Sequence, residues 1–383
     1  MMLNNVKRDT FMKKIKMLPL IGALVMAMSS LVSCEDSFIF DDRSECYSGV
    51  NLRFIYDYHM EPGANSFPVN VDCVTVFVFD TEGNYIKHIS EKSDALRSEG
   101  YRMNIPLEEG DYELIAWGGL TCEKATFDLT PDWLTRAGDT RNDMFVSLPL
   151  TDGISKKKLH DIEERSGGLF YGSIPLTIGE DDWAVPGQMR TVTMPVIKDT
   201  NNIQVILQEL SVPDQVDYND FDFKIIDDNF ILNADNQPVS VVTEDNQPLY
   251  EPYAAENRHM GYTQAGVNNG DPSSTDRTKE VQVACAEFST SRLLFEHLES
   301  ARLVVTSKEL KDDNGNDKVV IDIPLIKYLA ATRGFGLNWI KDDQEFLDRQ
   351  SNWTLIFFLQ RNEWAKARVV VNDWTVRTYN IEL

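Results

Sequence analysis

The cysteine at position 34 is the residue whose setting most clearly predicts a chemical modification. It follows sixteen uncharged, mostly apolar residues, Met17 to Val32, and three lysines lie just before them within residues 13–16. A basic head, a short apolar body and small residues before a cleavage point are typical of a secretory signal peptide. The apolar stretch is shorter than the ~20 residues that a helix needs to cross a membrane. We therefore expect residues 1–33 to be removed as a signal peptide.

The four residues Leu31-Val32-Ser33-Cys34 resemble a bacterial lipobox. In a lipobox the cysteine thiol forms a thioether to diacylglycerol, and the cysteine becomes the new N-terminus after cleavage, here between Ser33 and Cys34. Each buried CH₂ of an acyl chain is worth about 0.8 kcal/mol, so two or more chains hold a protein on a membrane stably. The alternative is an ordinary signal peptide with a chance cysteine near its end.

An acidic pair, Glu35 and Asp36, follows Cys34 directly. An acidic pair at this place resembles the surface-export signal of Bacteroidetes lipoproteins. Residues 34–46 are acidic and contain few core residues, so they are predicted to form an extended tether between the lipid and the folded part. The expected location is the outer membrane, with acylated Cys34 as the anchor and the folded part exposed at the cell surface.

The mature chain is strongly acidic. Removal of residues 1–33 takes away five basic residues and one acidic residue, which leaves 32 Lys or Arg against 60 Asp or Glu and a formal net charge of −28. Such a surface repels the phosphates of nucleic acids, so nucleic acid is excluded as a partner. It also keeps an exported protein soluble. About 350 residues with 42% apolar composition suffice for two folded domains.

Other residue types that could do chemistry do not fall into a recognised spacing. The five histidines lack a metal-binding spacing, and neither a Gly-x-Ser-x-Gly elbow nor a phosphate-binding glycine loop occurs. Acidic pairs are common, but nothing nominates two carboxylates for hydrolysis. We therefore expect no catalytic site, no metal, no cofactor and no enzyme activity. The histidines, each interpreted as a surface or strand residue, are His59, His88, His160, His259 and His297.

Two further patterns have a structural and a functional interpretation. Asp312 to Asp317 resembles a calcium loop but lacks a closing glutamate, since Ile323 stands at the twelfth position, so a hairpin turn is favoured. Trp353, Trp364 and Trp374 could form a sugar-binding platform, but Trp353 and Trp374 lie within strand patterns, which favours buried packing.

Four cysteines remain after Cys34 in the mature chain, namely Cys46, Cys73, Cys122 and Cys285. Their spacing fits neither a dense disulfide framework nor a Cys-x-x-Cys metal site, so their pairing stays open. Cys73 lies in an apolar, strand-like run, which favours an unpaired, buried side chain.

Short runs of β-branched and aromatic residues alternate with turn residues along most of the chain. Val50–Tyr56 alternates as a half-buried strand should, and Asp72–Phe79 is almost continuously apolar, which suits a central strand covered on both faces. Many strands of five to nine residues bracketed by Gly, Pro, Asn or Asp predict an all-β sandwich. Further strands are predicted at residues 85–89, 100–106, 111–117, 144–148, 191–196, 201–207, 221–226, 230–232, 239–242, 281–288, 302–306, 318–323, 353–359, 367–371 and 375–381.

The strand sets divide near residue 198. We predict an N-terminal β-sandwich domain over residues 47–198 and a C-terminal one over residues 199–383. Two short helices are predicted at residues 324–332 and 342–350, with Pro324 at a first helical position. Residues 120–165 are predicted to be a long excursion between strands, and residues 251–279, rich in Asn, Gly, Pro, Ser and Asp, an exposed loop.

Several of these strand blocks are similar to a known family. Cys46–Tyr56 soon after a lipobox, Val76–Asp80 with Gly83-Asn84-Tyr85, and Gly110–Gly118 resemble the fimbrial anchor lipoproteins of Bacteroidales, the FimB-type minor subunit family. Near the C-terminus, residues 345–350, 357–359 and 371–374 look similar too. The resemblance spans nearly the whole mature chain but consists of core and turn residues.

The resemblance implies two tandem transthyretin-like Greek-key β-sandwiches at the base of a fimbria. Such a subunit attaches the filament to the outer membrane, and it seeds or limits assembly by strand exchange with the first stalk subunit. An exposed sheet edge can accept an extended strand from a neighbour in this way. Two other hypotheses stand beside it: a surface lipoprotein that binds glycan or host protein through exposed loops such as residues 251–279, and a carboxylate hydrolase.

Overall fold

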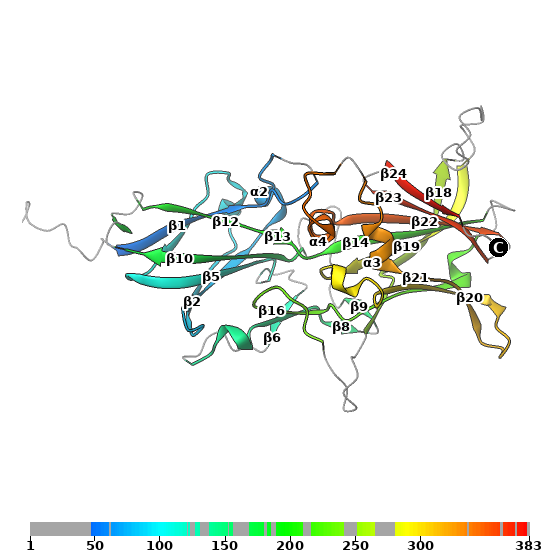
Figure 1. The fold of residues 1–383 in the computed structure, drawn as a ribbon, viewed down its shortest axis with the longest axis horizontal. Coiled ribbons are helices and arrows are strands. Elements are labelled where there is room, and N and C mark those ends of the chain that lie inside the picture. Colours follow the sequence, from blue (N-terminus) through cyan, green and yellow to red (C-terminus); the bar gives the residue numbers. More distant parts are fainter. Residues whose placement is uncertain are drawn as a thin grey trace, which may run out of the picture.

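Strands form most of the residues that the computed structural model describes, and the described helices are short, so the predicted all-β fold class is confirmed. Figure 1 shows an elongated molecule with β1 and β10 toward one end and β20 and β21 toward the other. None of the described helices is long and apolar enough to cross a membrane. The structure describes residues 47–60, 63–120, 122, 127–130, 138–151, 153–155, 168–179, 182–184, 189–209, 216–240, 251–264, 280–334, 337–360, 363–371 and 374–380.

Two facing sheets make up the N-terminal sandwich. In the first, β1 (Tyr47–Ile55) pairs in parallel with β12 (Thr191–Pro195) and antiparallel with β4 (Met103–Pro106) and β11 (Trp183–Ala184). The second is antiparallel and has the order β13-β10-β5-β2-β3. Its strands are β13 (Ile197–Lys198), β10 (Phe170–Ile178), β5 (Gly110–Gly118), β2 (Val74–Asp80) and β3 (Tyr85–Glu91).

The β2 strand is covered on both faces, as its sequence predicts. Val74, Val76 and Val78 contribute to the core between the two N-terminal sheets. Phe77 and Phe79 point to the opposite face and belong to a second, larger core. Because side chains alternate along a strand, a nearly continuous apolar run requires packing on both sides of the sheet.

The C-terminal sandwich also combines a larger and a smaller sheet. The larger has the order β18-β19-β14-β22-β23-β24, and the smaller β17-β15-β20-β21. The parallel pair β14 and β22 repeats the parallel pair β1 and β12 of the N-terminal sandwich. The strands are β14 (Asn201–Glu209), β15 (Phe221–Asp227), β17 (Glu251–Ala254), β18 (Asn257–Gln264), β19 (Glu280–Thr290), β20 (Arg302–Lys311), β21 (Asp317–Pro324), β22 (Asn352–Gln360), β23 (Glu363–Val371) and β24 (Trp374–Asn380).

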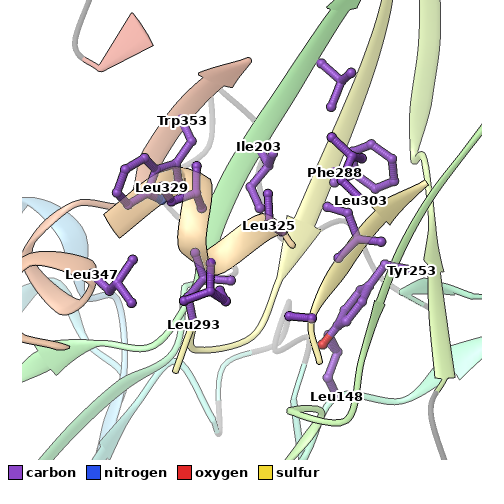
Figure 2. Close-up of a cluster of buried hydrophobic side chains, with 14 of the residues drawn as sticks. Leu148, Ile203, Tyr253, Phe288, Leu293, Leu303, Leu325, Leu329, Leu347 and Trp353 are labelled. Carbon is purple, nitrogen blue, oxygen red and sulfur yellow. The ribbon is translucent and has the colours of Figure 1, made fainter. Parts of the chain in front are cut away.

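Two short helices close the C-terminal core, α3 (Leu325–Ala330) and α4 (Asp343–Arg349). Figure 2 shows Leu325 and Leu329 of α3 beside Ile203 and Trp353, which lie on neighbouring strands. Asp342 caps α4 by accepting a hydrogen bond from the Glu345 amide, which satisfies a donor at the helix start. The remaining turns are α2 (Phe67–Asn70), η2 (Asp94–Arg97), η3 (Arg141–Asp143), η5 (Tyr218–Asp220) and η7 (Phe295–His297).

A small third sheet joins segments from both predicted domains. Its order is β16 (Ile231–Asn233), β7 (Phe145–Ser147) and β6 (Asp128–Thr130), and a hairpin of β8 (Leu150–Thr151) and β9 (Ile154–Ser155) lies nearby. Leu232 of β16 lies in the same core as Phe77 and Trp117 of the N-terminal sandwich. The apolar core therefore continues across residue 198, and the division into domains 47–198 and 199–383 stays a prediction.

Several strands differ from their sequence predictions. Sequence reasoning missed β10, which contains Gly172 and Pro175. Pro175 pairs with β5 on one side of β10. On the other side, β13 pairs only with Phe170 and Tyr171, so among the described strands none requires a hydrogen bond from the missing N–H of Pro175. Gly172 fits because the backbones approach closely there: a Cβ at this position would lie 2.5 Å from the Pro195 carbonyl oxygen.

The predicted loop over residues 251–279 is wrong in its first half, because β17 and β18 occupy residues 251–254 and 257–264. Among the described strands, both lie at the edge of their sheets, so their polar composition resembles that of a loop. Val239 and Ser240 of the strand predicted at 239–242 are not in a strand, and the rest lies outside the described residues. Helix α3 begins one residue after Pro324, and the excursion over residues 120–165 contains β6 to β9.

The interpretation of Cys73 as an unpaired side chain is wrong. Cys73 forms a disulfide with Cys122, with 5.5 Å between their Cα atoms. The chain turns sharply after β5 at Gly119, whose φ is +85° and whose amide donates to the Cys73 carbonyl, and this turn brings Cys122 back to the start of β2. Cys285 is unpaired and buried, and Cys46 lies outside the described residues.

Candidate functional site

The sequence-predicted site residues Ser33, Cys34, Glu35 and Asp36 all lie outside the described residues. The hairpin-turn interpretation of residues 312–317 is confirmed, and buried packing is confirmed for Trp353 alone of the three tryptophans. Asp312 to Asp317 forms the hairpin turn between β20 and β21, in which the Asp312 side chain accepts from the amides of Asn314 and Asn316. Trp353 is 2% exposed and packs in the core, whereas the side chains of the other two tryptophans lie outside the described set.

The most distinctive polar arrangement lies where the two sandwiches meet. Only Asp199 and Thr200 separate β13, at the end of the N-terminal sandwich, from β14, at the start of the C-terminal one. The Asp199 amide donates to the Leu169 carbonyl, which ties this connection to the N-terminal sheet. Asp199 and Thr200 are fully buried. The connection is therefore a short, packed segment rather than an exposed linker.

Arg292 is the centre of this junction. It follows β19 and donates two hydrogen bonds of 2.8 Å to the two carboxylate oxygens of Asp348 in α4. Its third donor reaches the Asn236 carbonyl oxygen at 2.6 Å, and its Nε lies 3.9 Å from Asp199 Oδ1. Arg292 and Asp348 are each 8% exposed. Four segments distant in sequence therefore meet around one guanidinium group.

The burial of this network shifts the ionisation of its members. Burial raises the pKa of Asp199 to about 7, and the nearby Arg292 and the hydrogen bond from Asn236 only partly oppose this. Burial opposes the charge of Arg292, but the hydrogen bond and the negative charge of Asp348 outweigh it and raise its pKa overall. Arg292 thus stays charged inside the protein because Asp348 compensates its charge.

A second, outer layer of the junction uses the next residue of α4. The guanidinium carbon of Arg349 lies 3.9 Å from the centroid of the Tyr58 ring, which follows β1, and 5.1 Å from that of Trp339. Arg349 also pairs with Glu345 at 2.7 Å. Asp348 and Arg349 therefore make inner and outer contacts of one junction, and the outer contact is a cation–π interaction.

The turn after β16 provides a third contact. Arg141 lies between Glu113 of β5 at 2.8 Å and Asp235 of this turn at 2.6 Å. The Tyr171 hydroxyl of β10 donates to the Ala234 carbonyl oxygen at 2.9 Å. A segment from the C-terminal half is thus fastened to the N-terminal sheet. Together with Arg292 and Arg349, these contacts fix the orientation of one sandwich on the other, which is a structural rather than a chemical task.

A compact set of metal-ligating side chains lies beside this junction. His297 Nδ1 at the end of η7 lies 2.6 Å from Asp227 Oδ1 and 3.4 Å from Asp228 Oδ1. Burial raises the pKa of Asp227, although the hydrogen bond with His297 opposes it. Burial lowers the pKa of His297, but the two carboxylates outweigh it and raise the pKa overall.

Comparison with known proteins identifies the family. The family model described as "Fimbrillin-A associated anchor proteins Mfa1 and Mfa2" matches residues 43–380. The chain belongs to this family. Membership gives it a fimbrial anchor or adhesin-like role at the cell surface, in association with fimbrial subunits, and the family is of a structural rather than an enzymatic type.

Several solved structures are similar to this chain over most of its length. A "putative adhesin" from Bacteroides thetaiotaomicron shares 34% identity at a TM-score of 0.67, over 87% of this chain and 98% of that one. A structure from the same organism, described as "putative polysaccharide binding proteins", shares 29% identity at a TM-score of 0.64, over 88% and 98%. The fimbrial anchor protein Mfa2 from Porphyromonas gingivalis shares the fold, with 16% identity and a TM-score of 0.56 over 87% and 100%. No curated protein matches the chain.

Sequence reasoning did not find the junction of this anchor-family chain. Arg292 and Asp348 lie 56 residues apart, and Asp199 and Asn236 lie 37 apart, so no local spacing links them. His297 was missed as a partner of Asp227 for the same reason, with 70 residues between them. The one available signal is Asn236, which adopts a positive φ of 57° in a turn that the residues Asn-Ala-Asp-Asn predict.

Proposed function

We propose that this chain is the lipid-anchored subunit at the base of a cell-surface fimbria, held in the outer membrane by acylated Cys34. The observation that carries the proposal is the position of the family match, which begins at residue 43, shortly after the lipobox. Residues 34–46 act as the tether, and Glu35 with Asp36 directs the lipoprotein to the cell surface. The junction described above suits this role, because a base subunit has to transmit tension between a filament and a lipid without bending between its sandwiches.

The attachment of the tether supports a load-bearing role. The tether leads into β1, which is hydrogen-bonded to β12 on one side and to β4 on the other. A pull on the tether along the β1 axis therefore acts on both ladders at once. Many hydrogen bonds then share the load instead of breaking one after another.

The partner in this proposal is the first stalk subunit, which associates by β-strand addition. This association seeds the assembly of the filament or limits its length. Among the described strands, β3 and β21 end their sheets, so each offers main-chain groups along one side, apart from the Tyr85 amide of β3, which donates to the Asp139 carbonyl oxygen. Such an edge accepts an extended strand through backbone hydrogen bonds, while alternating side-chain positions set the register. The exposure along β3 alternates strictly, which suits register selection.

Replacement of the lipidated cysteine tests the anchor. In the native bacterium, Cys34→Ala should release fimbriae from cells into the medium, and Ser33→Ala, which keeps a small residue before the cysteine, should leave them cell-bound. The measurement is the ratio of stalk protein in cells and in medium. Cell-bound fimbriae in Cys34→Ala cells whose membranes lack this protein would refute the proposal.

A second candidate function is the binding of glycan or host protein at the cell surface through exposed loops. It is favoured by the 29%-identical structure described as "putative polysaccharide binding proteins". Glycan-array binding by the purified chain, together with unchanged fimbriae in a deletion strain, would favour this function over the anchor.

A further inference from the structure

Asp227, Asp228 and His297 bring three potential metal ligands together at the end of strand β15 in the C-terminal sandwich. Asp227 ends β15, Asp228 follows it, and His297 belongs to η7. One ligand atom from each side chain lies within 4.8 Å of the other two. Both aspartates are buried, and the His297 side chain is 12% exposed. The two carboxylates are thus enclosed by the protein, and the imidazole is the most exposed member of the cluster.

The charges of this cluster do not balance with the protein alone. Two carboxylates face a single basic partner, His297, which is charged only when protonated. Among the described residues, neither a lysine nor an arginine forms an ion pair with Asp227 or Asp228. Buried Asp348, by contrast, has Arg292 as a permanent counter-charge. Buried carboxylates are normally compensated, so a net negative pair beside an imidazole favours an additional cation.

The surroundings hold the ligands in place. The Ser240 hydroxyl donates to Asp228 Oδ2 at 2.7 Å, and the Asp228 amide donates to Asp227 Oδ1 at 2.9 Å. The Tyr253 hydroxyl donates to Asn229, the residue after the two aspartates, and the Asn229 side chain donates to the Arg292 carbonyl oxygen. Such outer hydrogen bonds orient metal ligands and strengthen binding.

We propose that Asp227, Asp228 and His297 bind one divalent transition-metal cation, with zinc as the reference ion. Two carboxylates and a neutral imidazole neutralise a divalent charge and match the mixed oxygen and nitrogen ligands of Zn²⁺. Ca²⁺ and Mg²⁺ prefer oxygen ligands alone, so the imidazole selects against them. Water completes the coordination on the exposed side.

The distances require only a local adjustment. Ligands about 2.1 Å from a tetrahedral zinc ion stand roughly 3.4 Å apart, and His297 Nδ1 already lies 3.4 Å from Asp228 Oδ1. The 2.6 Å contact between His297 and Asp227 is a hydrogen bond, which has to widen for an ion to enter between the two atoms. A rotation of the partly exposed imidazole can provide this. A bound ion would then fasten η7 to the end of β15, next to the junction that contains Arg292.

Metal titration of the full chain tests this proposal. Untagged protein is purified in detergent, stripped with EDTA and titrated calorimetrically with ZnCl₂, CaCl₂ or MgCl₂. We expect saturation at one Zn²⁺ per chain, a higher melting temperature with zinc, and no comparable response to calcium or magnesium. His297→Gln and Asp228→Asn should each weaken zinc binding by about ten-fold or more. The control His88→Gln removes an exposed imidazole that bonds Tyr85 and should bind zinc like wild type.

The zinc measurements test the metal site alone, because their result does not depend on whether the chain anchors a fimbria. Absence of stoichiometric zinc binding by the wild-type chain overturns the site, as does unchanged binding by a folded His297→Gln chain. Should both variants fail to fold, X-ray absorption of the zinc-loaded wild type decides. One imidazole among oxygen ligands supports the site, and a sulfur ligand or several imidazoles refute it.

Discussion

Replacement of Arg292 by methionine should weaken the junction more than any exposed ion pair could. The substitution keeps most of the aliphatic volume but removes the charge that compensates Asp348 and lies 3.9 Å from Asp199. It also deprives the Asn236 carbonyl of its 2.6 Å hydrogen bond. Because these groups are buried, Asp348 would be left as an uncompensated charge.

The expected cost follows from this burial. Breaking a buried ion pair by removing one partner destabilises a protein by about 3–5 kcal/mol. Arg302→Met is the control, since Arg302 contacts Asp322 Oδ1 at similar distances of 2.7 and 2.8 Å, but their side chains are 32% and 50% exposed. Exposed pairs contribute about 0.2–1 kcal/mol. The double variant Arg292→Met with Asp348→Leu should recover part of the loss, because no uncompensated carboxylate then remains in α4.

Urea unfolding of the unlipidated Cys34→Ala chain provides the measurement. Trp117 and Trp353 are both buried, one in each sandwich, so tryptophan fluorescence reports on both. We expect a single transition in the control and a lower midpoint in Arg292→Met, with a tendency of the two sandwiches to unfold separately. A loss of free energy of unfolding in Arg292→Met no larger than in Arg302→Met would refute the role given to the junction.

Three further predictions concern other buried features. The pKa of Asp199 is about 7 in the folded chain, against an ordinary value of 3.8. Protonated Asp199 therefore contributes its full stability to the folded chain below pH 3.8, and this contribution is lost as the pH rises through about 7. Asp199→Asn should therefore gain up to about 4 kcal/mol over wild type between pH 4 and pH 8 in unfolding experiments; a pH-independent difference would contradict this. Loss of the Cys73–Cys122 disulfide, which spans 49 residues, should lower the free energy of unfolding by about 2–4 kcal/mol, and reduction of wild type should do the same. Gly172→Ala should cost about 1–3 kcal/mol in denaturation, because its Cβ would meet the Pro195 carbonyl, whereas Gly179→Ala has open space and should cost less.

The sequence predicted those elements whose pattern is decided locally. β2 was found because its apolar run has no polar side, and the structure covers both faces. β10 was missed because Pro175 and Gly172 are poor strand residues. Their presence is explained only by tertiary structure: β13 does not extend as far as Pro175, and the backbone of β12 approaches Gly172 closely. β18 was missed because an edge strand can be polar.

The candidate site was beyond local reasoning for a different reason. The junction depends on Arg292, Asp348 and Asp199, which come from separate segments and become related only by the packing of α4 on the connection between β13 and β14. Cys73 was misjudged because its partner follows a sharp turn at Gly119. The lipobox-like pattern at residues 31–34, by contrast, is contiguous, so its prediction needs no tertiary structure.

The small sheet of β6, β7 and β16 has a consequence for the order in which the chain can fold. Phe77 and Trp117 lie on a face that is completed by Leu232, and Leu232 comes from beyond residue 198. Met144 and Val146 of the N-terminal half also pack on this face, so a chain that emerges from its N-terminus carries an incompletely covered aromatic surface until β16 has followed. The N-terminal sandwich cannot reach its final packing before β16 has been added. A fragment that stops at residue 198 would expose this surface permanently and tend to aggregate.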